Sequence, residues 1–113
     1  MDRTNDIGFP GPLRDPWDVI DELRWAEGLE NELQKELSPE HKLYGKKATA
    51  IATRCDNDDV LFAFDDGSLA VVHLTWAKRE ETPPWPGHWP YPDALTCWKE
   101  HLQPEMEEWD EEE

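Results

Sequence analysis

The feature that most constrains the fold of this chain is a series of three strand-like segments joined by very short connections. Residues 48–55, 60–64 and 69–76 are rich in β-branched, aromatic and other apolar side chains. Asp65-Asp66-Gly67 separates the last two segments, and Asp-Gly between apolar runs is typical of a β-hairpin. Short connections join antiparallel neighbours, because a parallel pair needs a crossover of about a dozen residues. The sequence therefore predicts a three-stranded antiparallel meander.

A helical pattern precedes these strands. Apolar residues recur at three- and four-residue steps between residues 15 and 37, and Asp15-Pro16 has the chemistry of a helix start. Gly28 weakens a helix by about 1 kcal/mol relative to Ala, and the apolar stripe is interrupted next to it. Trp17, Ile20 and Trp25 fall off the stripe. We therefore expect an N-terminal helix with a break or kink near Gly28.

A second helical pattern follows the strands. Leu95, Trp98 and Leu102 form an apolar stripe within residues 93–103, which predicts a C-terminal helix. A three-stranded sheet needs a helix to cover its apolar face, and the two flanking helices supply that cover. The fold class predicted from the sequence is therefore α+β.

Composition indicates where the domain begins and ends. A chain of 113 residues matches one ordinary domain. Residues 1–14 mix Gly, Pro and polar side chains without periodicity, so we expect a mobile tail there. Residues 104–113 contain seven acids and are expected to form a solvated acidic tail, although Met106 and Trp109 offer apolar contacts to the body. A single α+β domain is then expected over residues 15–103.

Residues 82–92 form the most distinctive segment of the chain. Five prolines in these eleven residues predict a loop that is neither helix nor central strand. Rigid prolines lower the entropic cost of presenting aromatic side chains to a partner. The candidate interaction surface consists of Trp85, His88, Trp89 and Tyr91. In the alternative interpretation the loop folds back and its tryptophans complete the core, with Trp85 inclined toward packing and the later aromatics toward exposure.

The net charge of −16 limits the kinds of partner. Such a surface repels phosphate backbones and anionic lipids, which argues against direct binding of nucleic acid or membranes. A basic protein partner is electrostatically favoured, although the charge alone is also explained by solubility. No apolar stretch approaches the roughly 20 residues that span a bilayer, and the first residues lack the apolar run of a signal peptide. We therefore expect the protein to be located in the cytoplasm and expect Cys55 and Cys97 to be free thiols.

Few residues are candidates for chemistry. His73 lies within a predicted strand and Cys97 on the last helix, and together they are the candidates for a pocket or a Cys–His pair. The alternative is that His73 is partly buried and hydrogen-bonded while Cys97 packs as a small apolar side chain. The acidic cluster at 56–59 lacks the glycine and fifth-position oxygen ligand of an EF-hand. No nucleotide-binding or hydrolase motif is present, so we expect no cofactor and no metal.

Part of the chain resembles a family of small bacterial proteins of unknown function. The resemblance covers roughly residues 29–102 and implies a shared compact fold, without an activity or a ligand. It lies in five segments: Leu37-Ser38-Pro39, Leu43-Tyr44-Gly45, Asp56-Asn57-Asp58-Asp59-Val60-Leu61, Val71-Val72-His73-Leu74-Thr75-Trp76 and Trp85-Pro86.

Two functions remain open from the sequence. The first is a non-catalytic, acidic protein-interaction module, one form of which is an inhibitor or immunity-type protein that covers a basic partner. The second is a small enzyme or ligand-binding domain with a pocket near His73 and the Pro/Trp loop. The sequence does not define the oligomeric state or the partner.

Overall fold

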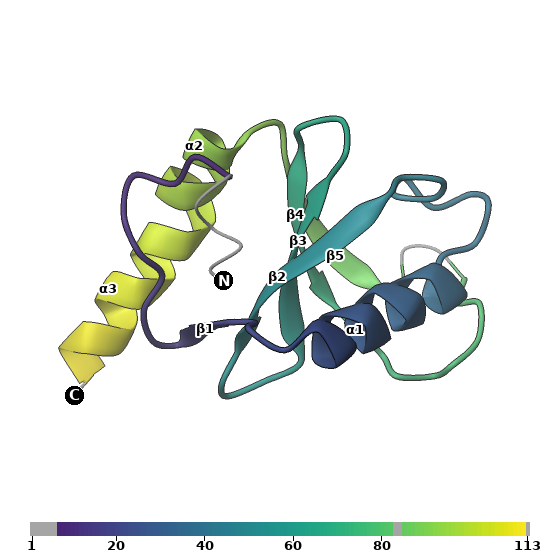
Figure 1. The fold of residues 1–113 in the computed structure, drawn as a ribbon, viewed down its shortest axis with the longest axis horizontal. Helices are drawn as coiled ribbons and strands as arrows, with labels where there is room; N and C mark the ends of the chain where they lie inside the picture. Colours follow the sequence, from purple (N-terminus) through teal and green to yellow (C-terminus); the bar gives the residue numbers. More distant parts are fainter. Residues whose placement is uncertain (1–6, 83–84, 113) are drawn as a thin grey trace.

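The protein is built around one five-stranded antiparallel sheet in which the strand order follows the chain (Figure 1). The computed structural model describes residues 7–82 and 85–112. The strands are β1 (Trp17–Val19), β2 (Ala48–Arg54), β3 (Asp59–Phe64), β4 (Leu69–His73) and β5 (Gly87–Tyr91). The predicted α+β class and antiparallel sheet are confirmed, and the three predicted strands correspond to β2, β3 and β4. Two further strands, one at each edge, were not predicted.

β1 replaces the predicted start of the first helix. Trp17 lies opposite Arg54 of β2, and the strand alternates between the buried Trp17 and the exposed Asp18. The prediction that Asp15-Pro16 begins a helix is therefore wrong. Pairing with β2 and burial of Trp17 outweigh the local helix-start chemistry, because tertiary contacts routinely override local propensity.

β5 replaces part of the predicted Pro/Trp loop. It pairs with β4 and places Pro90 opposite Ala70. Because β5 is the last strand of the sheet, one of its sides needs no hydrogen bonds from the ladder, and an edge strand tolerates proline for this reason. Residues 83–84 of the predicted loop lie outside the described residues.

Helix α1 (Leu23–Glu36) covers one face of the sheet. It runs without interruption through Gly28, so the predicted break at that residue is wrong. A Cβ atom added at Gly28 would meet nothing within 4 Å, which places the glycine on the outer side of the helix. The core on this face contains Ile20, Ala26, Leu29, Leu33, Leu37, Leu43, Ala50, Val60, Phe62, Phe64, Ala70, Val72 and Leu74.

The C-terminal helical segment covers the opposite face (Figure 1). It consists of α2 (Ala94–Cys97), the π-helical turn η2 (Trp98–Leu102) and α3 (Gln103–Glu112). The carboxylate of Asp93 accepts the first-turn N–H of Thr96 at 2.8 Å and caps α2. The core on this face contains Trp17, Ile51, Ala52, Leu61, Leu69, Val71, Cys97, Trp98, Leu102 and Met106.

Both segments expected to be tails contribute side chains to this second core. Met106 is completely buried, and Ile7, Phe9 and Leu13 pack against the same cluster. Residues 1–6 and 113 of those segments lie outside the described residues. In the described part of the chain, no helix has the length and apolar character needed to cross a membrane.

Candidate functional site

The predicted interaction surface lies on and just before the edge strand β5. Trp85 and Trp89 are 53% and 46% exposed, whereas His88 and Tyr91 are half-buried. Trp89 stands opposite Val71 of β4, so its position is fixed by the sheet ladder. Trp85 is the more exposed of the two tryptophans, although it was expected from the sequence to pack in the core. Large apolar side chains that stay exposed on a fixed backbone are suited to contact a partner.

A buried histidine holds the segment that leads into β5. The Nδ1 atom of His41 accepts the backbone N–H of Leu43 at 3.1 Å, which leaves the proton on Nε2. Nε2 then donates to the carbonyl oxygen of Pro86 at 3.1 Å. The rings of His41 and His88 lie 4.6 Å apart, and burial together with His41 lowers the pKa of His88. The two imidazoles therefore act as packing and anchoring groups at the start of β5.

Tyr91, the last residue of the predicted surface, points into a polar network. Its hydroxyl lies 2.7 Å from Nδ1 of His101. Burial raises the pKa of Tyr91 to about 12 and lowers the pKa of His101, so a protonated phenol donates to a neutral imidazole. Glu105, one turn further along, accepts hydrogen bonds from Trp17 Nε1 at 2.9 Å and from Arg54 Nη1 at 2.8 Å. These groups join the C-terminal helices to the sheet.

The two pocket candidates have separate surroundings. Nδ1 of His73 donates to Asp59 Oδ1 at 2.8 Å, and the ring of His73 is exposed. Cys97 is completely buried, and burial raises the pKa of its thiol to about 12. A thiol nucleophile must ionise near neutral pH, so Cys97 is unsuited to that role. Among the described residues, the His73 side chain forms a hydrogen bond with Asp59, and no hydrogen bond joins it to Cys97.

Trp25 and Trp76 form a pair where α1 meets the segment after β4. The sequence pattern did not connect these two residues. The rings of Trp25 and Trp76 are nearly parallel, at 11°, with centroids 6.3 Å apart, and the residues are 46% and 37% exposed. Trp25 is on α1, and Trp76 follows β4 in the left-handed region with φ 58°. The available signal was the position of Trp25 off the apolar stripe of the helix.

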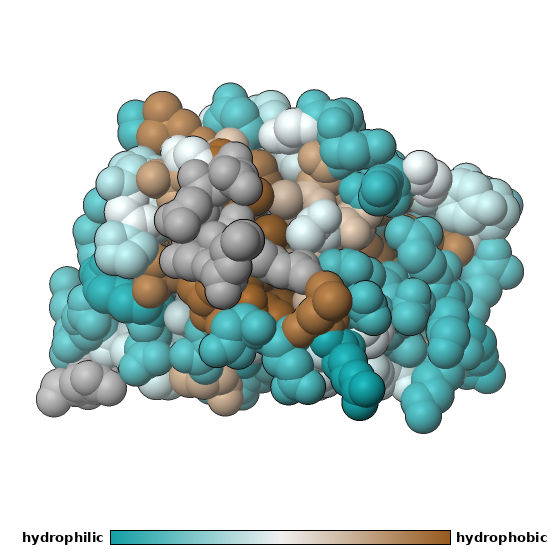
Figure 2. Space-filling view, viewed as in Figure 1, coloured by the Kyte–Doolittle hydropathy of each residue, from teal (hydrophilic) through white to brown (hydrophobic). Residues whose placement is uncertain are grey.

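Three hollows in the described surface are all lined by carboxylates. One of them, about 410 Å³, contains Glu40, Glu80 and Glu81 among its walls. A second, about 210 Å³, is lined by Asp56, Glu105, Glu108, Arg54 and Trp109. The third, about 110 Å³, lies between the tryptophan pair and the turn that precedes β3. Figure 2 shows hydrophilic side chains over α1 as well. Cationic groups are the ligands that such walls favour.

The described side chains do not form a metal centre, and the chain matches no known family. Within residues 7–82 and 85–112, no group of three or more His, Cys, Asp or Glu side chains is arranged to hold a metal ion. No protein-family model matches the chain, and the comparisons with curated proteins and with solved structures find no match. The function must therefore be inferred from the side chains themselves.

Proposed function

We propose that this chain is a non-catalytic protein-interaction module that binds a basic partner protein. The observation that carries the proposal is that four of the seven tryptophans stay exposed on a chain with a net charge of −16. Tryptophan is among the residues that contribute most to binding at protein interfaces, since it buries a large area with few torsions to fix. The exposed tryptophans are Trp25, Trp76, Trp85 and Trp89.

The distribution of charge supports a basic partner. All three hollows described above have carboxylates in their walls. Complementary charge steers association and suppresses wrong partners, while desolvated aromatic side chains supply affinity. In one form of this function the chain is an inhibitor or immunity-type protein that covers a basic site on its partner.

The states of the reactive side chains favour binding over catalysis. Burial keeps Cys97 as a thiol and Tyr91 as a phenol at neutral pH. Nδ1 of His101 accepts a hydrogen bond from the hydroxyl of Tyr91, and burial lowers the pKa of His101. The thiol and the phenol are therefore held in forms that are poor nucleophiles.

Affinity capture of the tagged chain from its native lysate, at low and at high salt, tests this proposal. We expect a basic protein in fixed stoichiometry that is lost at high salt, because salt screens exposed charges. The double variant Trp85→Ala/Trp89→Ala should capture much less of it. The matched control Leu23→Ala removes an exposed apolar side chain from α1 and should capture a normal amount. If no partner is captured, or if the double variant captures it as well as the parent chain, the proposal is wrong.

A further inference from the structure

We infer that the hollow beside Trp25 and Trp76 binds the guanidinium group of an arginine side chain from the partner. This inference rests on the proposed function and names the chemistry of one contact within it. The hollow is lined by Trp25, Leu29, Thr53, Arg54, Asn57, Asp58, Asp59, Val60 and Trp76. Nothing in the sequence pattern had connected these residues.

The first wall of this arginine pocket is aromatic. Trp25 and Trp76 present nearly parallel rings, and both keep a large part of their surface accessible to solvent. The face of an indole ring attracts a cation, most strongly among the aromatic side chains. A flat guanidinium stacks on such a face, which a rounded ammonium group does not.

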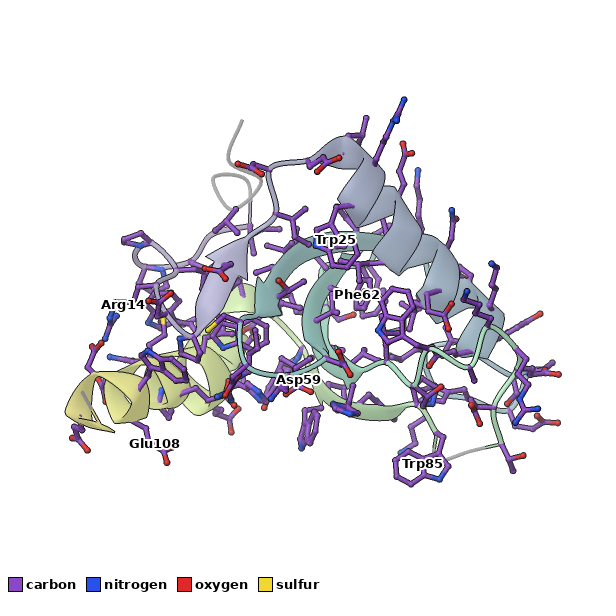
Figure 3. The ribbon with its side chains drawn as sticks, turned by 90° about the horizontal axis from the view of Figure 1, so that it is seen from below. Arg14, Trp25, Asp59, Phe62, Trp85 and Glu108 are labelled. Atoms are coloured by element: carbon purple, nitrogen blue, oxygen red, sulfur yellow. The ribbon has the colours of Figure 1, made fainter. Side chains whose placement is uncertain are left out.

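The second wall is acidic and comes from the turn between β2 and β3. Asn57 Oδ1 accepts the backbone N–H of Asp59 at 2.8 Å, which fixes the turn that carries Asp58. Figure 3 shows the positions of Trp25 on α1 and Asp59 at the start of β3. Carboxylates on one side and an indole face on the other match the forked donors and the flat surface of arginine.

The pocket's own arginine does not oppose a second cation. Arg54 donates from Nε and Nη2 to the two carboxylate oxygens of Asp56, at 2.8 and 3.0 Å. Its remaining nitrogen, Nη1, donates to Glu105 at 2.8 Å. The charge of Arg54 is thus offset by two carboxylates. Asp58 adds an exposed carboxylate to the pocket, while Asp59 is buried and its Oδ1 accepts a hydrogen bond from His73.

The volume of the pocket limits the size of the group that can bind in it. At about 110 Å³ it is well below the roughly 300–1,000 Å³ typical of pockets for whole small-molecule ligands. It is suited to the head group of one side chain. The aromatic wall is also held in place in advance, because Trp76 is fixed through its backbone N–H, which donates to the buried Glu36 at 2.9 Å. Such preorganisation lowers the cost of binding.

A titration of the ¹⁵N-labelled full chain with short peptides tests this inference without the partner. The probe is acetyl-Gly-Gly-Arg-Gly-Gly-amide, and the comparison peptides carry citrulline or lysine in place of arginine. We expect the arginine peptide to shift the indole N–H signals of Trp25 and Trp76 in a saturable way. The citrulline peptide, which keeps the shape without the charge, should leave them unchanged, and lysine should bind more weakly.

Variants locate the binding. Trp25→Ala, at an exposed helical position, should weaken arginine binding by about five-fold or more, whereas Tyr44→Ala removes an exposed aromatic outside the pocket and should not. Asp58→Asn should also weaken it and changes no apolar packing. Unchanged indole signals, equal shifts with citrulline or lysine, or undiminished binding by both pocket variants would overturn the inference. A salt-sensitive partner captured from lysate alongside a silent pocket would leave the proposed function standing and reject this contact alone.

Discussion

The carboxylate of Glu36 on α1 accepts the backbone N–H of Trp76 at 2.9 Å, although the two residues are 40 positions apart. Its other oxygen accepts the N–H of Thr75 at 2.9 Å, and Glu32 accepts the N–H of Lys78 at 3.0 Å. Trp76 and Lys78 have φ values of 58° and 60°, a region that side-chain-bearing residues rarely adopt. Two buried glutamates therefore hold the loop after β4 in the conformation that places Trp76 beside Trp25.

Replacing Glu36 with Gln should destabilise the fold. A glutamine amide offers one acceptor oxygen, so one partly buried backbone N–H would lose its partner at a cost of about 1–3 kcal/mol. Urea unfolding at pH 5, where Glu36 still contributes most of its stabilisation, measures this cost. Glu27→Gln, an exposed position on the same helix, should leave the free energy of unfolding nearly unchanged. Equal stabilities of the two variants would contradict the role assigned to Glu36.

The same residue predicts a pH dependence. Burial, with a hydrogen bond that protonated Glu36 donates to Glu32, raises the pKa of Glu36 from 4.5 to about 7. The folded state therefore holds this proton more tightly than the unfolded state, so its contribution to stability is full below about pH 4.5 and declines as pH rises to about 7. The difference in unfolding free energy between the parent chain and Glu36→Gln should follow this decline. A difference that is constant between pH 5 and pH 8 would show that Glu36 does not titrate in this range.

Removing the hydroxyl of Tyr91 should weaken the junction between β5 and the C-terminal helices. In Tyr91→Phe, Nδ1 of the largely buried His101 would lose its donor, at a cost of about 1–3 kcal/mol. Thermal or urea unfolding measures the loss. Tyr44→Phe makes the same chemical change at an exposed position and is the control. A loss no larger than that of the control would mean that the hydroxyl contributes nothing to stability.

Truncating Met106 should destabilise the protein even though it lies in an acidic terminal segment. Its side chain is completely buried in the core beneath the C-terminal helices, and Met→Ala changes in cores cost about 2–5 kcal/mol. Glu108→Ala, on the exposed side of α3, should cost much less. If both variants unfold at the same urea concentration, α3 does not pack as described.

The three central strands were predictable because each is a self-contained apolar run with turn chemistry beside it. The edge strands were not. β1 has three residues, too few to show a period, and β5 contains Pro90, which is tolerated only because the strand lies at the edge. Gly28 signalled a break, but a glycine on the outer side of a packed helix weakens the helix without interrupting it.

The candidate site was predictable only in part. The exposure of Trp89 agrees with the interpretation of the proline-rich segment as one that presents aromatic side chains, whereas Trp85, which was expected to pack, is also exposed. The pairing of Trp25 with Trp76 depends instead on hydrogen bonds between α1 and the residues after β4. The sequence had placed Trp76 in the third predicted strand, whereas β4 ends at His73. A sequence pattern reports local periodicity, and contacts over such a separation are set by tertiary packing.

The most direct test of binding to a basic partner is the association rate of the purified chain with the protein captured from lysate, measured from low to high salt. We predict a rate that falls steeply as salt rises, because steering by a surface of net charge −16 is screened. Trp85→Ala/Trp89→Ala should retain that salt dependence and dissociate faster, since buried aromatic contacts act mainly on the off-rate. An association rate independent of salt, with dissociation unchanged in the double variant, would contradict the proposed function.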